Sequence, residues 1–346
     1  MMPTKQKQQP AEGNSSAPTM ADVGRIAGVS AMTVSRALKG NAYIAKGTLD
    51  RILAAVDQLG YVLDQSAGSL SSRRTGFIAA IVPSIDNSNF ADTARGITEA
   101  LARTNMQLLL GYSNYSVERE EELIESMLRR RPEGIILTGG HHTRKARGML
   151  SNAGIPVIET WDRPENPVDA VVGFSNADAM EALVDSLVEQ GYSRFGFISG
   201  SETSDTRGQQ RQSGFSRALS RHGFSSERRV AVEAVPLRMS DGGTAIRQLL
   251  NRFPDTDVAV CVSDLVAFGA IMECRRMGLS VPHDIAIAGF GDYEIASVSE
   301  PGITTVNVDS YGIGTQAAGQ MIAMLDHRGH SATISTNYHV LLRGST

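Results

Sequence analysis

Short apolar runs alternate with helical patterns from residue 77 onward, and this alternation limits the possible folds more than any other feature of the sequence. The runs read FIAAIVP, LLLGYS, GIILTG, PVIETW, VVGFS, RFGFISG, VAVCVS, IAIAGF and ITTVNV. Such alternation predicts parallel strands that are covered by helices on both faces. The runs are too numerous for one doubly wound sheet, so we expect an α/β body of two lobes. Ligands of such folds bind at the carboxyl ends of the strands.

Residues 19–62 carry three shorter helical patterns. In the first, Thr19 is placed to cap the start of a helix and Gly28 to end it. A tight turn follows at once, and Ser30 can cap the second helix. The third pattern, TLDRILAAVDQLGY, ends at Gly60. Helix, glycine-containing turn and helix in this order predict a helix-turn-helix.

The charge of the chain is unevenly distributed. Residues 1–75 hold nine Lys and Arg against five Asp and Glu, whereas the remainder holds 24 against 32, within a net charge of −4. A basic head on an acidic body suggests that only the head approaches an anionic polymer.

The second helical pattern has two unlike sides. Val34 and Leu38 are four residues apart and point inward. The opposite side carries Met32, Ser35, Arg36 and Lys39. Arg36 could form a bidentate contact with guanine, and Ala31 and Met32 could contact thymine methyl groups. The short hydroxyls that could hold phosphates are those of Thr19, Ser30, Thr33 and Ser35. The spacing alone leaves a second interpretation open, in which this side is the solvated face of a three-helix bundle.

Several classes of protein are disfavoured. Cys261 and Cys274 lie in apolar surroundings without the Cys/His spacing of a zinc site, so no metal is expected. Residues 1–18 lack the apolar core of a signal peptide and are predicted to form a disordered tail. No stretch is apolar enough for a membrane helix, and we expect a cytoplasmic protein. The motifs of nucleophilic, nucleotide-binding and metalloprotease sites are missing, which argues against an enzyme and against a bound cofactor.

The segment MADVGRIAGVSAMTVSRALKG, followed by ILAAVDQLGY, resembles the head of the LacI/GalR family of bacterial repressors. The resemblance implies a three-helix, lambda-repressor-like DNA-binding head in which Ala31, Met32 and Arg36 read base edges. It extends over the body, where it implies a periplasmic-binding-protein-like effector domain of two doubly wound parallel-sheet lobes and a homodimer. The implied division is a tail at 1–18, a head at 19–62, a hinge at 63–75 and an effector domain at 76–346. Lobe one would comprise about 76–173 and 303–328, and lobe two about 174–302 and 329–346.

The hinge sequence VLDQSAGSLSSRRTG matches the family in position. The resemblance implies that it folds into a short helix on DNA and that Leu70, one turn after Ala67, wedges into the minor groove. Leu63 and Asp64 stand where the family usually has Pro-Asn. Asp64 could cap the hinge helix, but its charge would lie near phosphates.

Effector contacts are expected at the ends of strands. Ser84 and Phe90 follow the first strand, and Arg207 and Arg211 lie four apart on one helix face, where two guanidiniums could clamp a carboxylate or phosphate. The resemblance adds the carboxylate of Asp264, although Ser263 replaces the usual Asn before it. It also adds Asp292, while Gly291 stands where many relatives have an acid. Each of these residues also has an alternative role without ligand contact: Phe90 could belong to the core, the arginines could form a solvated face, and Asp264 could cap a helix.

Three segments, MTVSRALKG, LTGGHHT and PVIETWDRPENPVDAVVGFSN, resemble the regulators of gluconate use within the family. This implies a small-molecule effector such as gluconate, to which His142 and Thr143 could contribute, although His142 could equally be an exposed loop residue. The resulting hypothesis is a repressor that binds a palindromic double-stranded operator. Binding of the effector releases the repressor from this DNA. Alternatives are a family member that responds to a neutral sugar or nucleoside or acts with a corepressor, an α/β sugar-processing enzyme with a DNA-binding head, and a secreted sugar-binding protein.

Overall fold

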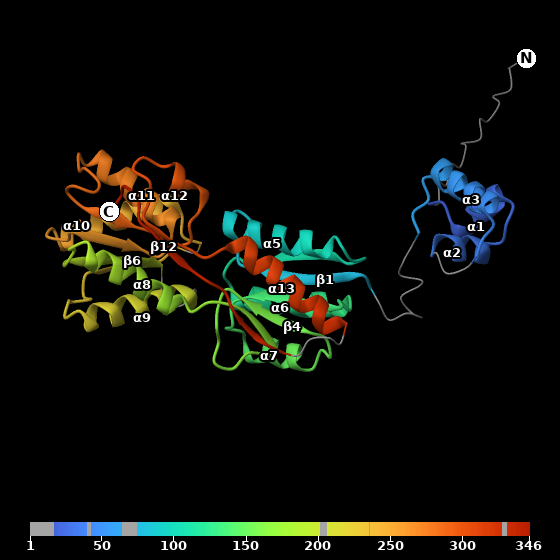
Figure 1. The fold of residues 1–346 in the computed structure, drawn as a ribbon, viewed down its shortest axis with the longest axis horizontal. Coiled ribbons are helices and arrows are strands. Elements are labelled where there is room, and N and C mark those ends of the chain that lie inside the picture. Colours follow the sequence, from blue (N-terminus) through green and yellow to red (C-terminus); the bar gives the residue numbers. More distant parts are fainter. Residues whose placement is uncertain (1–16, 40–42, 64–74, 201–205, 235, 327–330) are drawn as a thin grey trace, which may run out of the picture. The chain divides into compact units, whose positions relative to one another are not determined.

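A computed structural model describes residues 17–39, 43–63, 75–200, 206–234, 236–326 and 331–346. The chain forms two compact units, residues 1–75 and residues 76–346. Most of the expected tail and the hinge residues Asp64, Ala67 and Leu70 lie outside the described residues. Figure 1 shows a ribbon for each unit.

The first unit contains the expected helix-turn-helix. Its helices are α1 (Met20–Ala27), α2 (Ala31–Leu38) and α3 (Lys46–Leu59). The side chains of Thr19 and Ser30 cap α1 and α2, and Gly28 and Gly60 end α1 and α3 in the left-handed conformation. The buried core consists of Val23, Ala27, Val34, Ile52 and Ala55.

The first lobe of the second unit is built on a six-stranded parallel sheet in the order β11-β5-β4-β3-β1-β2. Its strands are β1 (Phe77–Val82), β2 (Gln107–Tyr112), β3 (Gly134–Thr138), β4 (Val157–Thr160), β5 (Ala170–Gly173) and β11 (Thr333–Ser335). The helices are α5 (Ser88–Leu101), α6 (Val117–Arg129), α7 (Arg144–Ser151) and α13 (Ser310–Leu325). Successive residues of β1 alternate between two core clusters, one on each face of the sheet.

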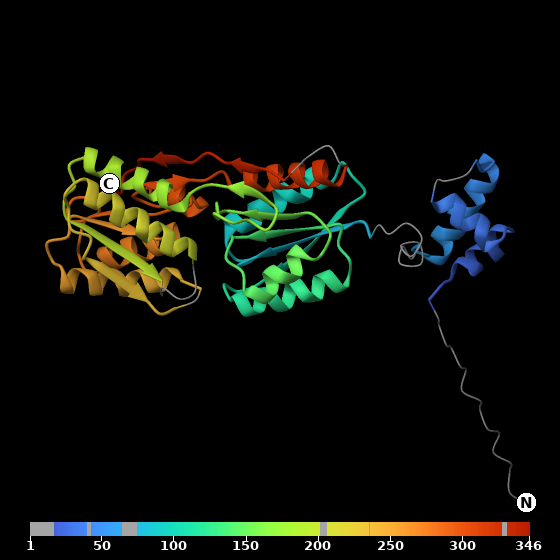
Figure 2. The same cartoon turned by 90° about the horizontal axis from the view of Figure 1, so that it is seen from below.

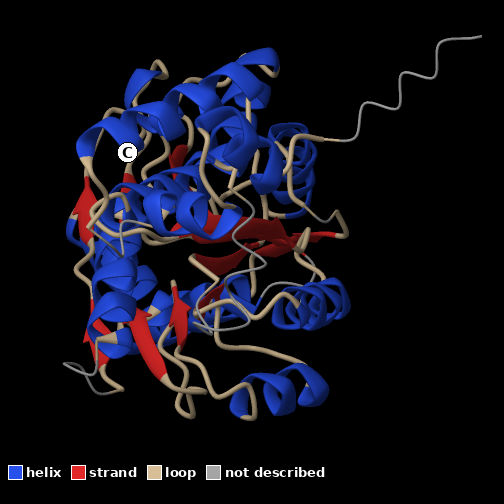
Figure 3. Ribbon diagram, turned by 90° about the vertical axis from the view of Figure 1, so that its right-hand side faces the viewer, coloured by secondary structure: helices blue, strands red, loops and turns tan. Residues whose placement is uncertain are grey.

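The second lobe is built on a four-stranded parallel sheet in the order β7-β6-β8-β9. Its strands are β6 (Phe195–Gly200), β7 (Arg229–Val232), β8 (Val258–Cys261) and β9 (Ala286–Ala288). The antiparallel pair β10 (Thr305–Asn307) and β12 (His339–Leu341) adjoins β9 through the Ala288–Thr304 bridge. The helices are α8 (Asn176–Glu189), α9 (Thr206–Arg221), α10 (Met239–Arg252), α11 (Asp264–Arg276) and α12 (Glu294–Val298). Both sheets lie between layers of helices, as expected for a doubly wound α/β fold (Figure 3).

The chain crosses between the lobes after β5, after β10 and after β11. The expected lobe boundaries therefore need two corrections. Residues 303–307 were assigned to lobe one, but β10 pairs with β12 in the second lobe. Residues 329–346 were assigned entirely to lobe two, but β11 pairs with β5 at the edge of the first sheet. The run ITTVNV predicted β10 as a strand but could not show that it pairs with the distant β12, and β11 has only three residues and gave no pattern in the sequence. Figure 2 shows the red C-terminal segment running along both lobes.

Neighbouring helices approach closely where one of them presents a glycine. A Cβ atom built on Gly314 of α13 would lie 2.1 Å from the carbonyl oxygen of Thr93 in α5. A Cβ on Gly214 of α9 would lie 2.1 Å from the carbonyl oxygen of Ala177 in α8. Since such distances are far below van der Waals contact, these helix pairs keep their spacing only with glycine at these positions.

We expect Gly314→Ala to lower the melting temperature of the effector domain, because the added methyl group forces α13 away from α5. Overpacking of this kind costs about 1–3 kcal/mol, which corresponds to roughly 2–4 °C for each kcal/mol in a domain of this size. Gly319→Ala is the matched control, since a Cβ there meets no atom within 4 Å and alanine favours the helix. Calorimetry of both variants would contradict this account if Gly314→Ala were as stable as Gly319→Ala.

Candidate functional site

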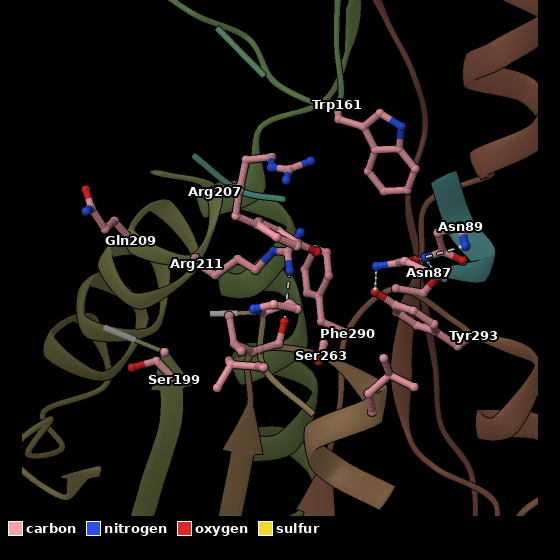
Figure 4. A pocket seen from close by; sticks show the side chains of 18 of the residues that line it. Asn87, Asn89, Trp161, Ser199, Arg207, Gln209, Arg211, Ser263, Phe290 and Tyr293 are labelled. Atoms are coloured by element: carbon pink, nitrogen blue, oxygen red, sulfur yellow. Dashed lines mark hydrogen bonds between the residues drawn. The ribbon is translucent and has the colours of Figure 1, made fainter. Parts of the chain in front are cut away.

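A cavity lies between the two lobes at the carboxyl ends of their strands (Figure 4). The first lobe contributes Asn87, Asn89, Phe90, Tyr115 and Trp161. The second lobe contributes polar and aromatic groups from the end of β6, from α9 and from the loops after β8 and β9, chiefly Ser199, Arg207, Gln209, Arg211, Gln212, Ser263, Phe290 and Tyr293. Both lobes therefore supply polar groups to one cavity.

Two guanidinium groups enter this cavity from successive turns of α9. Arg211 lies over the ring of Phe290 with its Cζ atom 4.0 Å from the ring centroid. Its Nε donates to Oδ1 of Asn176 at 2.9 Å, and its Nη1 donates to the carbonyl oxygen of Val262 at 2.8 Å. Arg207 is 6% exposed. These contacts hold Arg211 in one orientation before any ligand binds.

Hydrogen bonds join the lobes at one side of the cavity. Asn87, in the loop after β1, donates through Nδ2 to the hydroxyl oxygen of Tyr293 at 2.8 Å. Asn89 donates through Nδ2 to the carbonyl oxygen of Gly291, also at 2.8 Å. Figure 4 shows the Asn87 amide and the Tyr293 hydroxyl facing each other. The loop after β1 and the loop after β9 thus form a direct contact between the lobes.

Aromatic rings form another wall of the cavity. Trp161 follows β4 with φ 67°, and its ring lies edge-on to Phe90 at 5.2 Å between centroids. Its indole Nε1 donates to the hydroxyl oxygen of Thr93 at 3.1 Å, and its carbonyl oxygen accepts from Nδ2 of Asn176 at 2.9 Å. A left-handed conformation is uncommon for a bulky residue, and here the bond from Asn176 holds the backbone while the bond to Thr93 holds the indole.

Asp264 supports the site without lining it. It follows β8 as the first residue of α11, and its side chain is fully buried. Its carboxylate accepts from the Thr305 hydroxyl at 2.6 Å and from the backbone N–H of Tyr293 at 2.8 Å. Burial raises the pKa of Asp264 to about 7. We expected the carboxylate of Asp264 to accept hydrogen bonds from ligand hydroxyls. In the structure it instead binds the loop that carries Tyr293.

Ser84 and Asp292 also lie outside the lining of the cavity. The hydroxyl of Ser84 donates to the carboxylate of Asp86. Asp292 forms an ion pair with Arg343 at 2.7 Å and accepts from Nδ2 of Asn307 at 2.8 Å, so it ties the loop after β9 to the C-terminal segment.

His142 and Thr143 have contacts within the first lobe. Thr143 caps α7 by accepting from the backbone N–H of Ala146 at 3.0 Å. The side chain of His142 is 1% exposed and lies between two carboxylates, with Nδ1 2.6 Å from Glu120 and Nε2 3.2 Å from Glu159. Burial by itself would lower the pKa of His142, but the hydrogen bonds to both glutamates outweigh burial and raise the pKa to about 9. His142 is thus a buried cation rather than the exposed loop residue of the alternative interpretation.

Of the predicted effector residues, the structure brings Phe90, Arg207 and Arg211 to the cavity. The others, Ser84, His142, Thr143, Asp264 and Asp292, do not line it. The main residues that sequence reasoning missed are Asn87, Asn89, Tyr115, Trp161 and Tyr293. A usable signal existed for Trp161, the single tryptophan of the chain, because it directly follows an expected strand.

The helix-turn-helix presents one side of α2 to solvent. Arg36, Lys39 and Ala31 are exposed, and Met32 is 65% exposed, whereas Val34 is buried. The hydroxyls of Ser30 and Thr33 are 2.9 Å apart. Thr19 donates through its hydroxyl to the Asp22 carboxylate at 2.6 Å as part of a capping box. The expected base-reading side chains therefore share one exposed surface with short hydroxyl groups at the helix N-terminus.

Among the described residues, no group of His, Cys, Asp and Glu could hold a metal ion. None of their helices has the length and apolar character required to span a membrane. Cys261 and Cys274 are buried, and burial raises the pKa of both thiols, that of Cys274 to about 11.

Comparison with known proteins agrees with this architecture. Residues 19–64 match the model for bacterial regulatory proteins of the lacI family, and residues 184–346 match the periplasmic binding protein-like domain. The transcriptional regulator GntR of Escherichia coli K12 is 34% identical over 91% of this chain and 94% of its own length. GntR of Pseudomonas aeruginosa PAO1 is 33% identical over 95% of this chain and 96% of its own length. A crystal structure of a LacI-family transcriptional regulator from Silicibacter pomeroyi has a TM-score of 0.89 at 32% identity and covers 95% of this chain and 99% of that one.

The helix-turn-helix and the two-lobed domain together define a DNA-binding transcriptional regulator. The identity over nearly the whole length shows that the chain belongs to the lacI family of bacterial regulatory proteins.

We expect the stability of the protein to fall as the pH rises toward 9, because His142 loses the proton that its two glutamates stabilise. The pKa of His142 is about 9 in the folded state against 6.5 as its ordinary value. The stabilisation is therefore fully present below pH 6.5, amounts to roughly 3 kcal/mol there, and is lost as the pH rises through about 9. Urea unfolding of the wild type between pH 6 and pH 10 measures this slope.

The variant His142→Gln should show no such slope between pH 7 and pH 9. His283→Gln changes an exposed imidazole and should retain it. An unchanged slope in His142→Gln would show that another group causes the pH dependence.

Proposed function

We propose that this protein is a homodimeric, cytoplasmic repressor of a sugar-acid catabolic operon, and that a gluconate-type effector releases it from a palindromic operator. The relatives named GntR support the proposal, and so does the transcriptional regulator IdnR of Escherichia coli K12, which is 31% identical over 93% of this chain. The observation that carries it is the pair of guanidinium groups, Arg207 and Arg211, in the cavity between the lobes.

An acidic ligand suits this cavity on electrostatic grounds. In the described part of the chain, the lining contains two guanidiniums and no carboxylate. Guanidinium groups bind carboxylates through charge-assisted hydrogen bonds, which are about twice as strong as neutral ones. Arg211 is oriented by Phe290, Asn176 and Val262, so little conformational entropy is lost when an anion pairs with it.

The remaining lining suits the polyhydroxyl part of a sugar acid. The lining contains amide and hydroxyl groups that can donate hydrogen bonds to ligand hydroxyls and accept hydrogen bonds from them. These groups belong to Asn87, Asn89, Ser199, Gln212, Ser263 and Tyr293. The rings of Trp161 and Phe290 add apolar surface to the lining. A lining that combines convergent polar groups with aromatic surface suits a small polyhydroxylated molecule.

For operator binding, we propose that α2 enters the major groove and that Arg36, Ala31 and Met32 contact base edges. The hydroxyls at the helix N-terminus would hold phosphates. In the hinge, Ala67 and Leu70 would contact the minor groove, with Leu70 as the apolar wedge. Two heads of a dimer would then read the two half-sites of a palindrome.

The effector releases the repressor from the operator if it binds the arrangement of the lobes with low operator affinity more tightly than the arrangement that binds the operator. Asn87 and Asn89 connect the lobes at the edge of the cavity, so a ligand that contacts them acts on the same contact. A coupling of about 1–3 kcal/mol between effector and operator would change operator affinity by several-fold to a hundredfold.

We expect calorimetry to show binding of gluconate or a related sugar acid, such as 2-ketogluconate or 6-phosphogluconate, but not of neutral hexoses. Arg211→Met should weaken this binding at least tenfold, because it removes a positive charge that pairs with the carboxylate. Arg217→Met is the matched control on the same helix, since Arg217 is 53% exposed and pairs with Asp178 at the surface. Binding of neutral hexoses alone would favour the neutral-sugar alternative, and equal affinities in the two variants would remove Arg211 from the site.

We expect Arg36→Ala to relax the base preference at one position of each half-site at a cost of roughly 1–3 kcal/mol. Selection of binding sites from random duplexes measures this preference. Arg51→Ala, which changes an exposed side chain on α3, should leave the preferred bases unchanged. An identical base profile for the wild type and Arg36→Ala would contradict the role of Arg36 as a base reader.

A further inference from the structure

A second pocket adjoins the cavity at the carboxyl ends of β1, β2 and β3. It has a volume of about 290 Å³, against about 90 Å³ for the cavity described above. The two spaces share Tyr115, Arg207 and Gln209 as lining residues. We call the first space the inner cavity and the second the outer pocket. Arg207, which lies over the ring of Phe90 with its Cζ atom 5.2 Å from the centroid, is therefore located where the two spaces meet.

The outer pocket is lined mainly by groups that hydrogen-bond to sugars. Hydroxyl groups line it at Ser113, Ser116, Thr138 and Thr206. Glu120 adds a carboxylate. Tyr115 lines both spaces, and its backbone has a left-handed φ of 60°. Hydroxyls, a carboxylate and an aromatic ring are suited to a polyhydroxylated ring.

Glu120 is held in place from behind and keeps one oxygen for a ligand. The residue is 7% exposed, and its Oε1 lies 2.6 Å from Nδ1 of His142. The other nitrogen of His142 is 3.2 Å from Glu159, whose second oxygen accepts from the backbone N–H of Val168 at 2.8 Å. Within the described part of the chain, Oε2 of Glu120 has no hydrogen-bond partner. This oxygen is available to accept from a ligand hydroxyl.

The outer pocket extends the proposed function to a ligand that is larger than gluconate. A six-carbon acid needs only one of the two spaces, but Arg207 belongs to both. We propose that the outer pocket binds a glycosyl unit attached to a sugar acid, so that the preferred effector is an aldobionic acid. In this arrangement the acid end pairs with Arg207 and Arg211 at the inner cavity, and the glycosyl ring lies against Tyr115 and Glu120. The inference rests on the proposed binding of a sugar acid.

Isothermal titration of the full-length protein tests this inference with gluconate, maltobionate and lactobionate, and with maltose and lactose as neutral counterparts. The expected result is that at least one aldobionic acid binds ten or more times tighter than gluconate and that the neutral disaccharides do not bind. Glu120→Gln should reduce the affinity ratio between aldobionic acid and gluconate at least tenfold. Val117→Phe, which fills the outer pocket, should do the same if Glu120→Gln does not fold. Glu122→Gln, an exposed residue of the same helix, should leave both affinities unchanged.

The outcomes separate the inference from the proposed function. Gluconate that binds as tightly as the aldobionic acids overturns the outer pocket as a glycosyl site and leaves the proposed function standing. An aldobionic acid whose advantage survives both Glu120→Gln and Val117→Phe also overturns it, because the glycosyl unit must then bind elsewhere. A protein that binds no acid at all contradicts the proposed function itself.

Discussion

The apolar contact through which the two lobes share one core is the interaction on which the rest of the effector domain depends. Phe90 and Trp161 of the first lobe belong to the same buried cluster as the strands and helices of the second lobe. Ring contacts lead from Trp161 through Phe174 to Phe290. Phe90, Trp161 and Phe290 lie near the carboxyl ends of the strands and also line the inner cavity. The burial that joins the lobes therefore shapes the ligand site, and a molecule that enters the cavity acts on the contact between the lobes.

Buried charged groups around the cavity orient loops. Asp264 holds the backbone at Tyr293, and His142 lies between Glu120 and Glu159. An unpaired ion in a protein interior is costly, so the protein supplies hydrogen bonds to Asp264, His142 and Glu159, and His142 pairs with one oxygen of Glu120. The consequence is a rigid set of strand ends, from which the amides, hydroxyls and guanidiniums of the two spaces project. Preorganised groups of this kind lose little entropy when a ligand binds.

Local patterns in the sequence predicted a large part of this architecture. Helix caps and periodicity located α1, α2 and α3, and apolar runs located nine of the twelve strands that the described residues form. The remaining strands, β7, β11 and β12, are three or four residues long and partly exposed, so their apolar signal is weak. In the site, Arg207 and Arg211 were found because helical spacing places them on one face. Asn87 and Tyr293 were missed because their hydrogen bond joins residues that are 206 positions apart.

By itself, the sequence determined the helix-turn-helix, the α/β body and the family to which the chain belongs, because caps, periodicity and apolar runs are properties of neighbouring residues. Only the tertiary structure decided which strand ends meet across the lobes and which polar groups face a cavity. In the folded chain Asp264 and His142 form hydrogen bonds with protein groups, and Arg207 lines both the inner cavity and the outer pocket. Sequence spacing cannot show this, because the direction of a buried side chain depends on the partners that distant segments supply in the folded chain.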